Sequence, residues 1–220
     1  AHDWSVLDGT HSDRNMRKLA KLITIAISNR WPLVLLIEGN GSRSSDPLPV
    51  PPIVNYTRAR WDVFEGLCEL SGWAPTVAIA VGTARDSHAA MTFLCDLTIA
   101  TKKSEFGSNL DSSECEPAES LAERGNIDVV VEDIQEAVSA AQRFLTYWHE
   151  DISDFAASDS ADDISNIVPE NRRRPYDMRK VIAAFADKDS VFEVGGAWAP
   201  SLITALSLIH ISEPTRRPKI

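Results

Sequence analysis

The sequence places an acid, a hydroxyl and an imidazole side by side at Asp86, Ser87 and His88. These are the side chains of a serine-hydrolase triad. However, consecutive residues at a helix start point in different directions, and nothing in the sequence positions a base against the hydroxyl. His88 could instead donate to an oxyanion or act as a base, and the alternative is a merely polar helix start. Asp86 also has a structural alternative, because aspartate is a favoured N-cap for the helix predicted to follow it.

A second candidate is the turn Gly39-Asn40-Gly41, which ends an apolar run. Glycines allow a backbone to approach a ligand closely. A dinucleotide site is disfavoured, because Ser44 stands where the G-x-G-x-x-G fingerprint needs its third glycine. An ordinary strand-to-loop turn is the alternative. The histidines, cysteines and carboxylates show no metal-ligand spacing, so we expect no metal.

A regular alternation of helices and strands must position these residues. Residues 13–30 carry an amphipathic helical pattern, and the apolar strand 33–39 follows. A continuous apolar strand after such a helix is typical of a sheet covered on both faces. The alternation continues with helices expected at 56–72, 86–96 and 134–148 and strands at 76–82, 97–101 and 126–133. The pattern predicts an α/β fold.

Charge and composition exclude several classes of function. A net charge of −10 over 220 residues argues against a general nucleic-acid or anionic-membrane binder, though not against a local cationic site. No apolar run approaches the roughly 18 residues that a membrane span needs. The cysteines form no C-x-x-C pair, so we expect reduced, mostly buried thiols in a cytosolic protein: Cys68, Cys95 and Cys115.

Two stretches carry no periodic pattern. Residues 39–55 are rich in Pro, Ser and Gly, and their length favours a functional loop over a passive connector. Residues 150–164 are acidic and rich in Ser, which predicts a linker or a solvated surface. After this stretch we expect a helix starting near Pro175 and strands at 190–194 and 201–206.

Several motifs, in this order, resemble the acyl-CoA carboxyltransferases, the β subunits of biotin-dependent acetyl-CoA and propionyl-CoA carboxylases. The motifs that resemble the first half of these enzymes are VLDGTHSDRN, PLVLLIEGNGSR, CDLTIAT and DVVVEDIQEAVSAAQRFLTYW. The segment VPENRRRPYDMRKVI, followed by SVFEV and LITAL, resembles the junction between the two halves of these enzymes. The resemblance covers nearly all of residues 3–205.

The resemblance implies a crotonase-like fold, a spiral of ββα units, with one near-complete domain and the start of a second. Residues 1–149 would form a partial N-terminal acyl-CoA domain, residues 150–168 an acidic linker, and residues 169–205 the opening of the C-terminal domain. A start without Met, at Ala1, fits a fragment or a processed chain.

The family moves a carboxyl group from carboxybiotin to the α-carbon of an acyl-CoA through an enolate. Biotin sits on a partner carrier domain, a biotin carboxylase is the second partner, and the parent assembles as a homo-oligomer in the cytoplasm or the mitochondrial matrix. No metal, nucleic acid or membrane is implied. By this resemblance Gly39, Asn40, Gly41 and Arg43 bind substrate, with Arg43 meeting a CoA phosphate. The oxyanion loop, at the start of a helix, corresponds to Ser87 and His88.

The chain departs from the family where glycines are expected. Asp86 and Ser87 lie where the oxyanion loop normally has small residues, and only Gly107 remains of a second glycine-rich segment. A carboxylate about 4 Å from a developing enolate opposes it by roughly 1 to 4 kcal/mol, on the order of 5- to 1000-fold in rate. We therefore expect a diverged, inactive fragment. The alternatives are a non-catalytic acyl-CoA-binding or assembly subunit, and another crotonase-like hydratase or isomerase, which the PYDMRKVI segment disfavours.

The C-terminal stretch LSLIHISEPTR, residues 206–216, matches the translation of a common transposase sequencing adapter. Agreement over eleven consecutive residues by chance is very improbable. We predict that residues 206–220 are adapter read-through and not native sequence, so His210 and the basic end carry no function.

Overall fold

The computed structural model describes residues 1–43, 56–108, 115–148, 167–171 and 173–208. The chain divides into two compact units. The first unit comprises Ala1–Leu145 with Gly195–Pro200, and the second comprises Thr146–Val194 with Ser201–Ile220.

The first unit is built on a six-stranded sheet with β2 at its centre. β2 pairs in parallel with β1, β3 and β4, and β6 continues the parallel set beyond β3. Only β5, which pairs with β4, is antiparallel in the described part of this sheet. In chain order the elements are η1 (Leu7–Gly9), α1 (Asp13–Asn29), β1 (Leu33–Gly39), α2 (Tyr56–Leu70), β2 (Thr76–Arg85), α3 (Ser87–Phe93), β3 (Leu97–Thr101), β4 (Glu105–Gly107), β5 (Glu116–Pro117), α4 (Ala118–Glu123), β6 (Val129–Val131) and α5 (Ile134–Thr146).

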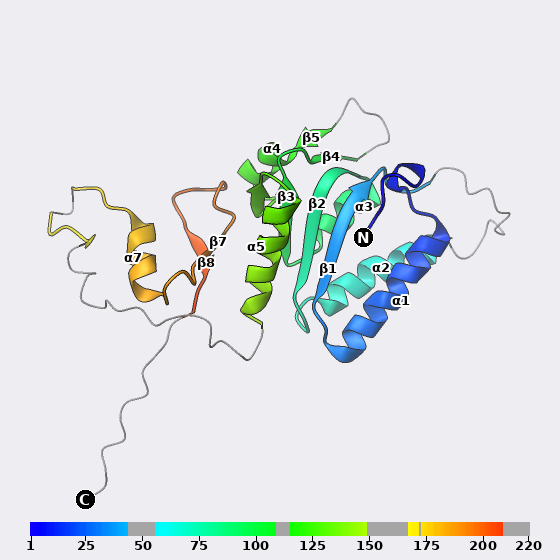
Figure 1. Ribbon diagram of the computed structural model, residues 1–220, viewed down its shortest axis with the longest axis horizontal. Coiled ribbons are helices and arrows are strands. Elements are labelled where there is room, and N and C mark those ends of the chain that lie inside the picture. Colours follow the sequence, from blue (N-terminus) through cyan, green and yellow to red (C-terminus); the bar gives the residue numbers. More distant parts are fainter. Residues whose placement is uncertain (44–55, 109–114, 149–166, 172, 209–220) are drawn as a thin grey trace, which may run out of the picture. The chain divides into compact units, whose positions relative to one another are not determined.

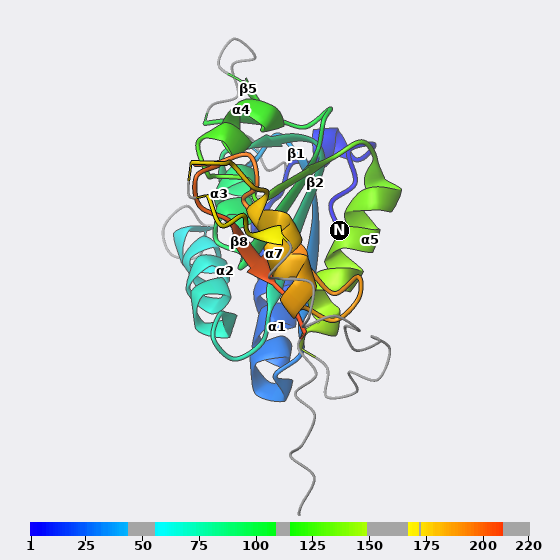
Figure 2. The same ribbon diagram turned by 90° about the vertical axis from the view of Figure 1, so that its left-hand side faces the viewer.

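Helices cover this sheet unevenly. α5 lies on one face, and α2 and α3 lie on the other (Figure 1; Figure 2). β3 is buried along its whole length and β2 along its first five residues, as their apolar runs predict. β1 instead alternates, with Val34 more than one third exposed. The prediction of a sheet covered on both faces therefore holds for the centre and is wrong for β1, which pairs on one side with β2.

The predicted elements are present, with two informative differences around the candidate site. β1 and β3 have the predicted bounds, and α1 ends one residue before the predicted limit. β2 runs on to Arg85, three residues further than predicted, so α3 begins only at Ser87. The strand and the helix thus join through a single residue, Asp86.

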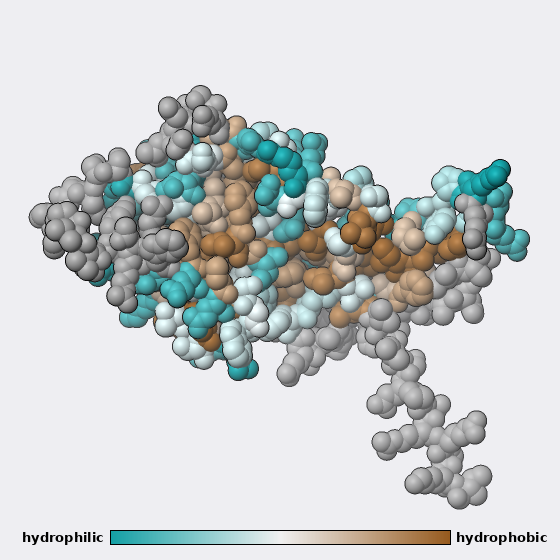
Figure 3. Space-filling view, turned by 180° about the vertical axis from the view of Figure 1, so that it is seen from behind, coloured by the Kyte–Doolittle hydropathy of each residue, from teal (hydrophilic) through white to brown (hydrophobic). Residues whose placement is uncertain are grey.

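The second unit contains one helix and one two-stranded sheet among its described residues. α7 (Met178–Phe185) begins three residues after Pro175, with Asp177 accepting the Arg179 N–H as its N-cap at 2.9 Å. β7 (Phe192–Val194) pairs antiparallel with β8 (Thr204–Leu206). Hydrophobic surface extends over these elements (Figure 3), and its large exposed side chains are Tyr176, Met178, Phe185, Leu202 and Leu206.

The predicted segment boundaries fall partly outside the described residues. The acidic linker lies mainly in residues 149–166 and most of the predicted read-through in residues 209–220, neither of which is described. Leu206 pairs with Phe192, and the Leu208 carbonyl accepts the Asp187 N–H at 2.8 Å. The domain boundaries and the read-through therefore remain predictions.

The thiols are less buried than expected. Cys68 is exposed and Cys95 and Cys115 are intermediate, so the expectation of mostly buried thiols is wrong. All three are free thiols, as predicted. Desolvation raises the pKa of Cys95 to about 12, so this thiol stays protonated. Within the described ranges, no helix combines the length and the apolar character required to cross a membrane.

Candidate active site at the carboxyl ends of two parallel strands

The two turns singled out in the sequence meet in the fold. β1 ends at Gly39 and β2 at Arg85, and Gly39 pairs with Ala84 of β2. Ligand sites in parallel α/β sheets form beyond the carboxyl ends of the strands. The segment before α1 holds the first turn in place: the His11 N–H donates to the Gly41 carbonyl at 3.0 Å, and the Arg43 N–H donates to the His11 carbonyl at 3.0 Å.

The glycines of the first turn allow protein segments to approach one another. A Cβ on Gly39 would lie 2.6 Å from the Gly9 carbonyl oxygen. Gly41 has a φ of +76°, and a Cβ there would lie 2.7 Å from the Asp86 Cβ. These contacts explain both glycines without a ligand, so substrate binding by Gly39, Asn40 and Gly41 remains a prediction.

The two other predicted binding side chains in this turn differ in their surroundings. The guanidinium of Arg43 donates from Nε to the Thr10 hydroxyl at 3.3 Å and from a terminal nitrogen to the Thr10 carbonyl at 3.2 Å. The amide oxygen of Asn40 is buried and accepts no hydrogen bond from the described residues.

Asp86 fills the space between the two turns. Its backbone has φ 50° and ψ −119°, a combination that normally requires glycine. Its carboxylate accepts the Ser42 hydroxyl at 3.1 Å and, at a longer 3.4 Å, the Ser42 N–H. Asp86 occupies the N-cap position of α3, yet its side chain makes no capping bond. Helix capping therefore does not explain Asp86. Its carboxylate instead accepts hydrogen bonds from Ser42 of the first turn.

Ser87 pairs with a histidine far away in sequence. Its hydroxyl oxygen lies 2.6 Å from Nε2 of His11, a residue 76 positions earlier, and both residues are about 1% exposed. The same oxygen is 3.4 Å from the Asp86 carboxylate. Sequence reasoning rejected a triad built on His88 and missed His11, because no local pattern links residues so far apart.

His88 is a neutral hydrogen-bond donor. Its Nδ1 accepts the Gly41 N–H at 3.0 Å, so the ring proton resides on Nε2. That Nε2 is buried, and no described residue accepts from it. Burial, followed by the nearby His2 and His11, lowers the pKa of His88 to about 2. His88 is therefore unsuited to act as a base, whereas donation to an oxyanion, its other predicted role, is chemically open.

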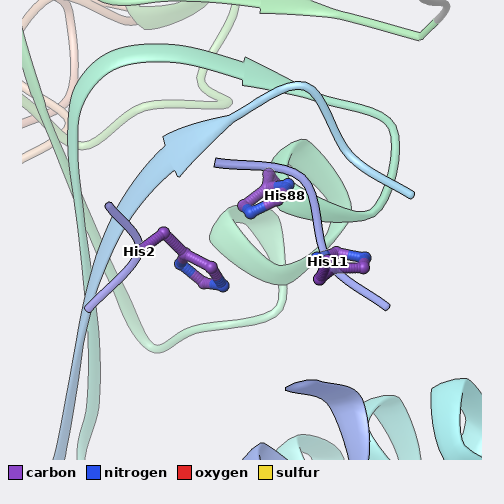
Figure 4. A group of neighbouring side chains, drawn as sticks. All are labelled: His2, His11 and His88. Carbon is purple, nitrogen blue, oxygen red and sulfur yellow. The ribbon is translucent and has the colours of Figure 1, made fainter. Parts of the chain in front are cut away.

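Three imidazoles converge here, contributed by His2, His11 and His88 (Figure 4). The ring centre of His88 lies 4.3 Å from that of His2 and 4.6 Å from that of His11. One nitrogen of each ring lies within 4.8 Å of the others, a grouping that the sequence did not predict. Nδ1 of His2 contacts the Leu36 carbonyl at 3.2 Å, and burial lowers its pKa.

The hydrogen bonds of the cluster bear on whether it could hold a metal. A metal needs an imidazole lone pair. Binding through Nε2 of His88 would move the ring proton to Nδ1, against the Gly41 N–H that Nδ1 now accepts. The described arrangement therefore suits proton and hydrogen-bond chemistry better than metal binding.

Two cavities in the first unit flank the cluster. The first, of about 500 Å³, is lined by two histidines, two lysines and apolar side chains, among them His2, His11, Lys18, Lys21, Leu22 and Leu35. The second, of about 440 Å³, is bordered by Asp86 and is mainly apolar, with Phe93, Phe106, Leu121 and Arg124 among its lining residues. An extended ligand with apolar and anionic parts suits such surroundings.

Comparison with known proteins gives a consistent result. Residues 1–210 match the family described as the carboxyl transferase domain. The biotin-dependent acetyl-/propionyl-coenzyme A carboxylase beta6 subunit of Mycobacterium tuberculosis is 25% identical in an alignment of 222 positions that covers 93% of this chain and 45% of that subunit.

Solved structures agree with the sequence match. A single-chain, multi-domain long-chain acyl-CoA carboxylase superposes with a TM-score of 0.81 at 28% identity, covering 94% of this chain and 21% of the other. The transcarboxylase 12S hexamer, with methylmalonyl-coenzyme A bound, gives a TM-score of 0.77 at 23% identity over 94% of this chain and 42% of the other. The fold is therefore crotonase-like, as predicted. The chain spans less than half the length of the curated relatives that it matches.

Proposed function

Since the chain belongs to the carboxyl transferase domain family, we propose that it is part of the acyl-CoA half of a biotin-dependent carboxyltransferase. Its substrate would be an acyl-CoA thioester, and the reaction would add a carboxyl group at the α-carbon through an enolate. The enolate places negative charge on the thioester oxygen, which preorganised N–H donors stabilise.

One observation carries this proposal. The Ser42 N–H and hydroxyl, beyond the end of β1, both point at an anionic oxygen, the Asp86 carboxylate. A group of donors that holds a carboxylate oxygen has the chemistry to hold an enolate oxygen at the same place. The flanking cavities support an acyl-CoA by their apolar walls and by the cations Lys18 and Lys21 of the first cavity.

The same observation favours a second candidate, a non-catalytic subunit that binds acyl-CoA or supports assembly. The Asp86 carboxylate accepts from the Ser42 donors, and it carries the same negative charge as the enolate would. As it stands, the chain would therefore stabilise the enolate poorly, and we propose that this fragment does not carboxylate. A hydratase or isomerase is less well supported, because the family match continues through the residues that follow Pro175.

We propose the partners that the family reaction requires. The carboxyl group would arrive on biotin held by a carrier domain, after its loading by a biotin carboxylase. The transcarboxylase 12S structure is a hexamer, and homo-oligomerisation of the parent protein is proposed by analogy. The free cysteines fit a reducing compartment, the cytoplasm or the mitochondrial matrix.

Binding calorimetry with the propyl thioether of CoA, which cannot be hydrolysed or enolised, tests the proposal. We expect saturable binding that weakens with an Arg43→Met variant. The matched control, Arg179→Met, replaces an arginine of the second unit that is paired with Glu193 and should leave binding unchanged. No binding by the full chain would refute both CoA-based candidates. Carboxylation of propionyl-CoA after addition of a carrier and a biotin carboxylase would refute the inactive assignment.

A further inference from the structure

Ser87 occupies a strand-to-helix elbow. β2 ends at Arg85, α3 begins at Ser87, and the single residue between them, Asp86, has a strained φ of 50°. Nucleophilic serines of α/β-hydrolases lie on a similar turn, but there the serine itself is the strained residue and its hydroxyl is exposed. In this chain the strained residue is Asp86, and Ser87, about 1% exposed, follows it as the first residue of α3. The turn brings the Ser87 hydroxyl to the carboxyl end of β2, where it meets a partner from another segment of the chain.

An imidazole nitrogen lies within hydrogen-bond reach of this hydroxyl. The Ser87 oxygen is 2.6 Å from Nε2 of His11, against 3.4 Å from the Asp86 carboxylate. The shorter contact makes the imidazole the main partner of the hydroxyl. Main-chain bonds between His11 and both Gly41 and Arg43 fix the segment that carries the imidazole. A serine activated by an adjacent imidazole is the standard arrangement for covalent acyl transfer.

The donor for the negative charge of such a reaction is adjacent. Ser42 lies 3.5 Å from Ser87, measured between the hydroxyl oxygens, and its N–H already contacts a carboxylate oxygen. The contacts of the Asp86 carboxylate with Ser42 and Ser87 are long, from 3.1 to 3.4 Å. Contacts of this length open more easily than the 2.6 Å contact between Ser87 and His11 when a ligand enters.

We propose that Ser87 and His11 form a nucleophile–base pair that hydrolyses acyl thioesters, an activity distinct from carboxyl transfer. The thioester assignment rests on the proposed function, because the substrate is the acyl-CoA of the same site. The pair itself rests on the 2.6 Å contact between two buried side chains.

The reaction needs water as its only reactant besides the thioester. The Ser87 hydroxyl gives its proton to His11 Nε2, and its oxygen bonds to the thioester carbonyl carbon. The oxyanion forms beside the Ser42 N–H. As the carbon–sulfur bond breaks, the CoA thiolate takes the proton from His11. Water then attacks the acyl-serine, His11 takes the water proton and returns it to the Ser87 oxygen, and a carboxylic acid leaves.

Two probes test the pair on the full chain. A fluorophosphonate should label Ser87, located by peptide mass spectrometry, and propionyl-CoA should lose its ultraviolet thioester absorbance. Absorbance is preferred to thiol titration because the chain has three free cysteines. Ser87→Ala and His11→Gln should each lower kcat/KM by about 100-fold or more. Ser104→Ala removes another buried serine, one that donates to the Ala80 carbonyl, and should retain the activity.

The outcomes separate this inference from the proposed function. Binding of the CoA propyl thioether together with unlabelled Ser87 and no hydrolysis would overturn the inference and leave the proposed function intact. Labelling of Ser87 without thioether binding would support the pair and overturn the assignment to CoA. Equal hydrolysis by Ser87→Ala and the unaltered chain would also overturn the inference, provided that the variant still binds the thioether and so retains its fold.

Discussion

Both ends of the central strands place an aspartate among hydroxyl groups, with opposite results. At the amino ends, Asp96 accepts the Thr76 N–H and hydroxyl at 2.8 Å, and Asp128 accepts the Thr98 N–H and hydroxyl at 2.8 and 2.7 Å. Each aspartate N–H donates back to the same threonine at 2.9 Å. At the carboxyl ends, the contacts of the Asp86 carboxylate with Ser42 and Ser87 are longer, 3.1 to 3.4 Å, and Asp86 has a strained backbone.

The difference separates a structural use of aspartate from a functional one. The reciprocal bonds at the amino ends recur in two successive strand pairs and satisfy buried backbone groups, which stabilises the sheet. The carboxyl ends combine strain, long contacts and a buried donor on His88 that no described residue accepts. Such features cost stability and are retained mainly where a ligand completes them.

Removal of Asp128 should have the largest effect on folding. Asp128→Ala leaves the buried Thr98 N–H without its acceptor, and hydrogen bonds to charged groups contribute about 1.5 to 3 kcal/mol each. We expect a loss of about 2 to 3 kcal/mol in urea unfolding, with unchanged CoA-thioether binding. Asp128→Asn keeps an acceptor oxygen and should recover more than half of the loss. A loss of binding without a loss of stability would reverse the roles assigned to the two ends.

The pH dependence of stability should reveal the buried histidine at the other end. The pKa of His88 is about 2 in the folded chain against 6.5 for the free group, so the unfolded chain binds more protons between these values. Stability therefore falls as the pH drops below about 6.5 and gains nothing from His88 above it. The slope is about 1.4 kcal/mol per pH unit, or about 2 kcal/mol between pH 6.5 and pH 5.

An isosteric variant checks the origin of that slope. His88→Asn retains an acceptor for the Gly41 N–H but does not titrate, so its unfolding free energy should vary less over the same pH range. An identical slope in the variant would show that another group is responsible, and His2, whose pKa is also lowered, is the next candidate.

The sequence predicted the strands better than the side-chain contacts at their ends. The bounds of β1 and β3 followed from apolar runs, because burial on a sheet dictates local composition. The pair Ser87–His11 has no such local cause: it depends on how the segment before α1 returns to the sheet. The aspartate–threonine bonds at the amino ends did leave a signal in the sequence, an aspartate directly before a strand, at Asp96 before β3 and at Asp128 before β6.

The strain at Asp86 gives a smaller and opposite prediction. Asp86→Gly relieves a conformation that costs about 1 to 3 kcal/mol for a residue with a Cβ, while the long Ser42 contacts are lost. We expect a net gain of about 1 kcal/mol in stability. Asp86→Asn keeps the strain but removes the charge, so it should leave stability nearly unchanged and tighten binding of the CoA propyl thioether about 5-fold, equivalent to about 1 kcal/mol. Weaker thioether binding by Asp86→Asn would show that the carboxylate assists the ligand.

The hydroxyls of Ser42 and Thr98 provide the most direct test of the comparison. Ser42→Ala removes a 3.1 Å contact from a partly exposed residue to a carboxylate that keeps other donors, so stability should fall by about 0.5 kcal/mol. Thr98→Val removes a 2.7 Å bond to Asp128 in a buried position, with almost no change in shape, and should cost about 1.5 to 2 kcal/mol. The ratio of the two losses in stability compares the hydroxyl–aspartate hydrogen bond at the carboxyl ends of the strands with the one at their amino ends. Equal losses would mean that the hydrogen bonds at the carboxyl ends stabilise the fold as much as those at the amino ends. The case for a ligand site there would then rest on His11 and Ser87 alone.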